Sequence, residues 1–132
     1  IIELGWLDRP QVMALMSSSL AGLVVFHPVP NHLEAQPNKL FEYMSAGLPV
    51  IASDFPLWRD IIESAGCGIL VDPLDPAAIA KAIDWMCVNQ DEARRMGARG
   101  RAAIEGKYNW KNECKALVEG YSELLELGPS RD

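Results

Sequence analysis

The sequence predicts an α/β fold with a parallel sheet of about four strands and further helices at its C-terminal end. One observation behind this prediction is a set of short apolar runs, among them residues 22–26 and 49–52. Such runs are typical of strands buried on both faces of a parallel sheet. The other observation is that a helical pattern follows each run, which indicates parallel strands joined by helical crossovers.

The individual elements follow from these runs and from the residues that begin and end helices. The predicted strands are residues 1–4, 21–26, 49–53 and 69–71. The predicted helices are residues 10–18, 38–46, 57–64 and 91–106, one that begins at residue 76, and one that follows residues 108–109. Pro76 suits the first helical position after the N-cap Asp75, and Asp91 is the expected cap of the next helix. Gly47 is expected to end the helix predicted over residues 38–46.

Apolar residues recur at helical spacing near the C-terminal end. The helix from residue 76 is expected to bury one face, which carries Ile79, Ile83, Met86 and Cys87. The last helix has an apolar stripe of Trp110, Cys114, Leu117, Val118, Tyr121, Leu124 and Leu125. Three consecutive helices depart from strand–helix alternation. We expect them to pack over the sheet or to return as a strap to a neighbouring domain.

Composition and charge exclude several classes of protein. The net charge is −6, which argues against a general nucleic-acid binder, since such a protein needs a basic surface. A basic cluster at 94–107 is interleaved with acids and is interpreted as a solvated helix face. No run of about eighteen apolar residues is present, so no spanning helix is predicted. Cys67, Cys87 and Cys114 lack metal-ligand spacing and are interpreted as reduced thiols.

The segment from Glu34 to Glu42 carries the candidate chemistry. It lies between two predicted strands, and ligands of open parallel sheets bind beyond the carboxyl ends of the strands. Asn38, Glu42 and Ser45 share one face of the predicted helix. The two glutamates are expected on the order of 10 Å apart, which is too far for a glycosidase carboxylate pair. That separation suits one acid at each end of a long polyhydroxyl ligand.

A phosphate group between the two acids would meet the start of this helix. Residues 37–39 would offer free backbone N–H groups and the positive end of the helix dipole. His32 lies in the same loop and is a candidate ligand contact. A metal site of His27, His32 and Glu34 is not favoured, because their spacing across a proline-containing loop defines no ligand face.

These residues resemble the retaining, metal-independent glycosyltransferases with two Rossmann-like domains (the GT-B architecture), of the group 1 or family 4 type. The likeness is carried by Glu34 and Glu42 with seven residues between them, by Gly47-Leu48-Pro49-Val50-Ile51-Ala52-Ser53, and by Gly66-Cys67-Gly68-Ile69-Leu70-Val71-Asp72-Pro73. It continues through Met96-Gly97 and Tyr108-Asn109-Trp110, so it covers nearly the whole chain.

The resemblance implies a domain that binds a nucleotide-diphosphate sugar. Residues 1–127 would form a partial Rossmann-like domain of three layers, the C-terminal part of this donor domain, and residues 128–132 a tail. The rest of the domain and the acceptor domain would lie outside the chain. Glu34 would contact hydroxyls of the transferred sugar and is the candidate catalytic residue, while Glu42 would hold the ribose. Asn38, Lys39 and Leu40 would lie beside the diphosphate. No metal or other cofactor is implied.

The resemblance further implies a hexosyltransferase of polysaccharide biosynthesis that is inactive as this chain alone. The acceptor, a sugar or a lipid-linked glycan, would be bound by the other domain. The location would be cytoplasmic or peripheral at the inner membrane. Pro37 departs from the family pattern, because it removes one backbone N–H near the phosphate. The nucleotide base and the sugar are not indicated.

Two alternatives stay open at this point. One is a nucleotide-sugar epimerase of related architecture, and the other is a non-catalytic module that binds nucleotide sugars. In the family's strand order, the strand at residues 23–26 would also present a bare apolar edge. We expect residues 1–4 to pair elsewhere, or a second copy of the chain to cover this edge in a homodimer.

Overall fold

A computed structural model describes residues 1–127 and shows the predicted α/β architecture. Its sheet is parallel, has three strands in the described part of the chain and follows the order β1-β2-β3. The strands are β1 (Gly22–Val24), β2 (Val50–Ser53) and β3 (Gly68–Val71). Gly22 pairs with Val50, and Val50 in turn with Gly68, so the three strands begin in register.

The helices agree with the predicted ranges to within a residue or two, with one addition. They are α1 (Arg9–Ser18), α2 (Pro30–Leu33), α3 (Asn38–Ser45), α4 (Pro56–Ala65), α5 (Pro76–Val88), α6 (Gln90–Gly106) and α7 (Trp110–Leu127). The short helix α2 was expected to be loop. Asp75 caps α5 as predicted, through its carboxylate and the Ala77 N–H. The cap of α6 is Asn89, and Asp91 lies in the first turn.

The predicted strand at residues 1–4 does not form. Ile1 and Ile2 are almost fully exposed, and Leu4 is half exposed. A strand needs a hydrogen-bonded neighbour, and β1, whose outer edge is free in the three-stranded sheet, pairs only with β2. The sheet edge at β1 is therefore bare, and Leu23 on it is 48% exposed.

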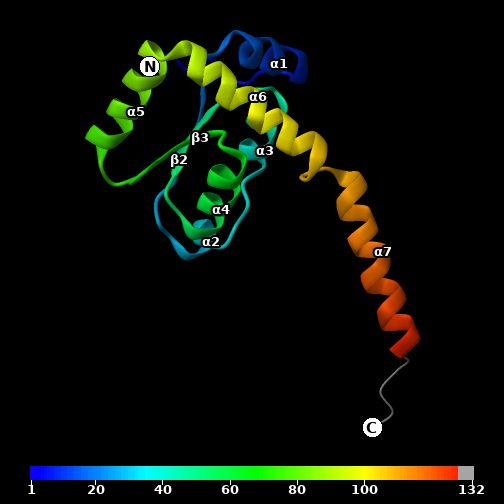
Figure 1. Cartoon of the computed structure of the whole chain (residues 1–132). Coiled ribbons are helices and arrows are strands. Elements are labelled where there is room, and N and C mark those ends of the chain that lie inside the picture. Colours follow the sequence, from blue (N-terminus) through cyan, green and yellow to red (C-terminus); the bar gives the residue numbers. More distant parts are fainter. Residues whose placement is uncertain (128–132) are drawn as a thin grey trace.

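Two apolar clusters cover the two faces of the sheet. Alternate residues of β2 divide between them, because successive side chains of a strand point to opposite faces. Val50 and Ala52 join the cluster under α3 and α4, whereas Ile51 joins the cluster under α5. Figure 1 shows α5 on the other side of the strands from α3 and α4, with α6 passing across the domain. The arginines of α6 lie on an exposed helix face, as predicted, and form ion pairs there with acids of the same helix.

The predicted burial of the apolar faces of α5 and α7 is only partly correct. In α5 the buried residues are Ala82 and Met86, while Ile83 and Cys87 are exposed. Helix α7 extends away from the sheet (Figure 1), and its apolar stripe, from Trp110 to Leu125, is exposed. The prediction that α7 packs over the sheet is therefore wrong. The alternative, that it returns as a strap to a neighbouring domain, stays a prediction.

In residues 1–127, no helix is both long and apolar enough to cross a membrane. The predicted tail, 128–132, lies outside the described residues.

Cys67 belongs to the cluster under α3 and α4 and provides a test of that core. Its side chain is fully buried, and burial raises the pKa of its thiol to about 11. The unfolded chain ionises this thiol near pH 8.5. Between these two values ionisation favours the unfolded state, so stability is fully present below about pH 8.5 and is lost as the pH rises toward 11.

We therefore expect the free energy of unfolding to fall more steeply with pH between about 8.5 and 11 in the unmodified chain than in Cys67→Ala. The difference should approach about 3 kcal/mol at most, from the size of the pKa shift. Urea titrations of both proteins at several pH values measure it. If the free energy of unfolding changed with pH in the same way in both proteins, this would contradict a buried, neutral thiol at Cys67.

Candidate active site

The loop that follows β1 is fixed at its beginning by Ser53, the last residue of β2. The Ser53 hydroxyl donates to the Phe26 carbonyl over 3.0 Å and accepts from the Phe26 N–H over 2.8 Å. Ser53 is fully buried and is the one buried polar residue among those described. The two strand ends are thereby joined at the carboxyl rim of the sheet, where ligands bind in open parallel sheets.

The same loop is fixed near its end by Trp58 of α4. The Trp58 indole N–H donates to the Ala35 carbonyl over 2.7 Å, directly after Glu34. The ring of Phe26 lies edge-on to the Trp58 ring at 5.6 Å, and the His32 ring packs on Phe26 at 4.9 Å. Because these contacts join residues far apart in sequence, helix α4 sets where the loop lies.

Within the loop, α2 determines where Glu34 and His32 are placed. Pro30 occupies the first helical position, and Glu34 is the C-cap, its N–H donating to the Pro30 carbonyl over 3.4 Å. The carboxylate of Glu34 is exposed. His32 is half-buried, and its Nδ1 lies 2.8 Å from the His27 carbonyl oxygen. Glu34 is thus presented to solvent by a loop that is anchored on both sides.

Helix α3 begins at Asn38, one residue after its N-cap Pro37, and no side chain caps it. Asn38 and Lys39 are exposed at this open end. Leu40 differs from them, because its side chain is fully buried in the core and its N–H donates to the Pro37 carbonyl over 3.0 Å. Unpaired N–H groups in the first turn give a helix a positive end that suits an anion.

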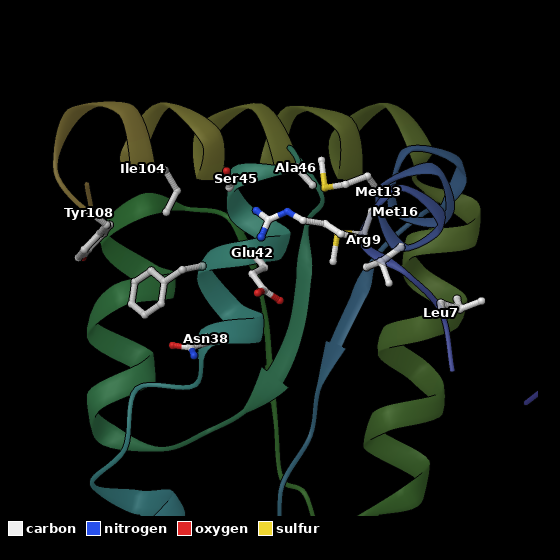
Figure 2. A pocket seen from close by; sticks show the side chains of 12 residues that line it. Leu7, Arg9, Met13, Met16, Asn38, Glu42, Ser45, Ala46, Ile104 and Tyr108 are labelled. Atoms are coloured by element: carbon white, nitrogen blue, oxygen red, sulfur yellow. The ribbon is translucent and has the colours of Figure 1, made fainter. Parts of the chain in front are cut away.

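A groove of about 690 Å³ runs along the exposed side of α3. It is lined by Leu7, Arg9, Val12, Met13, Met16, Asn38, Phe41, Glu42, Ser45, Ala46, Ile104 and Tyr108. In Figure 2, Asn38, Glu42 and Ser45 project from one face of α3, and Arg9 reaches in from α1 on the opposite wall. The predicted polar face of this helix therefore lines a cavity.

The predicted site residues divide into two groups. Asn38 and Glu42 lie in the groove, whereas Glu34, His32, Lys39 and Leu40 are not among its lining residues. Glu34 and His32 belong to the anchored loop, and Lys39 is exposed in the first turn of α3. Whether Glu34 and Glu42 serve one ligand stays a prediction.

The charge of Glu42 acts on the neighbouring Tyr43. Burial raises the pKa of the Tyr43 phenol above its ordinary value, and the Glu42 carboxylate raises it further. The Tyr43 ring packs against β1 so closely that a side chain at Gly22 would overlap it. Tyr43 is therefore a neutral packing residue at neutral pH and not a base. Among residues 1–127, no group of His, Cys, Asp and Glu side chains is arranged to hold a metal ion.

Several residues of the site have no signal in the sequence. Trp58 and Ser53 fix the loop through contacts across 23 and 27 residues, which no local pattern indicates. Arg9, the first residue of α1, lines the groove, although the sequence pattern assigns that helix no role in the site. In the sequence Tyr108 belongs only to the family resemblance, yet it lines the groove, with its ring centre 5.6 Å from that of Phe41.

Comparison with known proteins gives consistent matches. The family model described as glycosyl transferases group 1 matches residues 1–103. A D-inositol 3-phosphate glycosyltransferase from Nocardia farcinica is 30% identical over 97 residues, which make up 74% of this chain and 21% of that protein. A phosphatidyl-myo-inositol mannosyltransferase from Mycobacterium leprae is 32% identical over 89 residues, 67% of this chain and 24% of that protein.

A solved structure matches over almost the whole chain. Sucrose-phosphate synthase from Thermosynechococcus elongatus superposes with a TM-score of 0.81 and 25% identity, covering 95% of this chain and 30% of that one. This chain therefore spans less than a third of the length of each of these three proteins.

Proposed function

Because this chain belongs to the group 1 glycosyltransferases, we propose that it forms the half-site for the sugar donor, a nucleotide-diphosphate sugar, in the retaining transfer of a hexosyl group to an acceptor. Its fold is that of GT-B glycosyltransferases, as the likeness to sucrose-phosphate synthase indicates. The observation that carries the proposal is the groove beside α3, which is lined by Asn38 at the open end of the helix and by Glu42 one turn later.

The proposed roles follow from the chemistry of these groups. A carboxylate accepts two hydrogen bonds from vicinal hydroxyls, which suits Glu42 for a ribose and Glu34 for the transferred sugar. The uncapped start of α3, with Asn38 and Lys39, provides N–H groups and positive charge for the diphosphate. The proposal needs no metal ion, since these groups stabilise the leaving diphosphate by position and electrostatics.

The acceptor side belongs to the remainder of such an enzyme. We propose that an acceptor sugar or lipid-linked glycan is bound by a second domain, and that this chain alone does not turn over. We also propose a cytoplasmic location, free or peripheral at the inner membrane, because all three cysteines are free thiols, which is usual in reducing compartments. Cell fractionation tests this location.

Calorimetric titration of the 132-residue chain with UDP, GDP and ADP in turn tests the donor site. We expect saturable binding of at least one nucleotide, and weaker binding of the same nucleotide by Glu42→Gln. Circular dichroism of both proteins verifies that each is folded. Absence of binding for all three nucleotides by the folded chain would contradict the proposal. The isomerase alternative is not favoured, because the matched relatives are glycosyltransferases.

The bare edge of β1 suggests a further partner, a second copy of this chain. Leu23 is 48% exposed on this edge, and exposed apolar strand edges pair readily with other chains. We expect the mass measured by light scattering to rise toward a dimer with concentration, and Leu23→Lys to reduce that rise. A clean monomer at high concentration would contradict the homodimer.

A further inference from the structure

The hydrogen bond from Trp58 to Ala35 links the hydrophobic core to the peptide that follows Glu34. Trp58 is fully buried, and the rings of Phe26 at 5.6 Å and Phe55 at 4.8 Å pack against it. A ring held on two sides has a fixed orientation, and the indole N–H is a donor only. The direction of this hydrogen bond is therefore set by the core and not by the loop.

The acceptor is in a different environment from the donor. Ala35 is exposed as a residue, and the hydrogen bond that its carbonyl accepts is only partly buried, so water can reach this carbonyl once the indole N–H is removed. Losing this bond therefore leaves no stranded polar group in the core, and the expected consequence is a shift of the loop and not a failure to fold. The effect of Trp58 on the loop can therefore be tested by substitution in a chain that still folds.

The rest of the loop transmits the constraint to Glu34. Ser53 holds Phe26 at the beginning of the loop through two hydrogen bonds, and α2 closes on itself through the Glu34 N–H and the Pro30 carbonyl. Glu34 is thus the last residue of a hydrogen-bonded turn, and the next peptide is the one that Trp58 holds. Small displacements of a ligand-contacting group are costly when binding depends on its position.

We infer that Trp58 is a positioning residue of the donor site: its indole N–H fixes the peptide after Glu34 and thereby aims the Glu34 carboxylate at the transferred sugar. The inference rests on the proposed contact between Glu34 and the sugar. Trp58 thereby has a different role from Glu42, since the proposed ribose contact lies on α3 and not on the loop. Trp58 therefore governs recognition of the sugar and leaves recognition of the nucleotide unchanged.

The test compares two ligands on the same protein. For whichever base binds, the affinity for the nucleoside diphosphate and for the corresponding sugar, for example UDP and UDP-glucose, is measured by calorimetry. The ratio of the two affinities is the gain from the sugar. In Trp58→Phe we expect this gain to fall by about three- to tenfold, as one lost hydrogen bond predicts, with the affinity for the diphosphate unchanged.

Ile62→Val is the matched control. Ile62 lies on the same helix and in the same cluster and is buried to 1% exposure, and its shortening loosens the core but removes no hydrogen bond of the loop. We expect it to keep the full gain from the sugar. Equal loss of both affinities in the two variants would mean that Trp58 is only a structural residue, and an undiminished gain in Trp58→Phe would also overturn the inference.

A second measurement needs no variant. In the assigned NMR spectrum of the unmodified chain, the Trp58 indole N–H resonance should shift on addition of UDP-glucose more than on addition of UDP. Equal shifts would overturn the inference. If the chain binds UDP but gains nothing from the sugar, the proposed role of Glu34 fails and the positioning role fails with it, while Glu42 as the nucleotide contact stands. Absence of binding for both ligands overturns the proposed function itself.

Discussion

Gly97→Ala is expected to lower the free energy of unfolding by about 2–3 kcal/mol, near the upper end of what overpacking costs. Gly97 is buried in α6, where the helix crosses the turn between α3 and β2. A Cβ at this position would overlap the Gly47 carbonyl oxygen and lie 3.3 Å from the Pro49 ring. Both obstacles belong to the backbone or to a rigid ring, so the helix itself must move.

The turn that Gly97 meets has little freedom to yield. Gly47 has a φ of 74°, its N–H donates to the Met44 carbonyl over 3.0 Å, and the Leu48 N–H donates to the Tyr43 carbonyl over 2.9 Å. Displacing α6 would also separate Gly100 from Met44, which is fully buried in the cluster under α3 and α4. The overlap therefore outweighs the gain in helix propensity of alanine over glycine, which is about 1 kcal/mol.

Gly106→Ala, at the end of the same helix, is the matched control. A Cβ there has no atom within 4 Å, so this variant should be as stable as the unmodified chain or slightly more stable. Urea titration of the three proteins measures the differences. Equal stability of Gly97→Ala and Gly106→Ala would show that α6 does not pack on the turn as closely as the structure has it.

Most of the fold could be predicted because its signals are local. Apolar runs mark the three strands, Asp75 with Pro76 marks the start of α5, and Gly47 marks the end of α3. The short helix α2 was missed because proline-rich segments usually indicate a loop, although Pro30 also suits the first position of a helix. The strand at residues 1–4 failed for a different reason: an apolar run forms a strand only beside a neighbour.

The candidate site was predictable only as far as helix periodicity reaches. The spacing of Asn38, Glu42 and Ser45 placed them on one face, and the structure puts that face in the groove. The positions of Trp58 and Arg9 relative to the site depend on how α4 and α1 pack, which is a tertiary property. For the same reason, the sequence alone could not distinguish Leu40, with its buried side chain and hydrogen-bonded N–H, from its exposed neighbours.

Glu42→Gln is expected to weaken binding of the nucleoside diphosphate by about tenfold or more, since a hydrogen bond to a charged group contributes about 1.5–3 kcal/mol. The substitution keeps the size of the side chain and removes its charge and one acceptor oxygen. Glu42 is exposed, so the fold should not change. Calorimetry with UDP, GDP or ADP measures the affinity. The matched control is Glu63→Gln, an exposed acid on α4 outside the groove, which should bind as the unmodified chain does.

Glu34→Gln should give the complementary result. Because Glu34 lies on the anchored loop and not in the groove, its loss should leave the affinity for the diphosphate unchanged and reduce only the gain from the sugar. A carboxylate that accepts a pair of hydroxyls loses about half of this capacity as an amide, so a loss of about tenfold is expected. If Glu34→Gln instead weakens the diphosphate as much as Glu42→Gln does, the two acids contact the same end of the ligand. The division of the donor site into a ribose contact on α3 and a sugar contact on the loop would then be wrong.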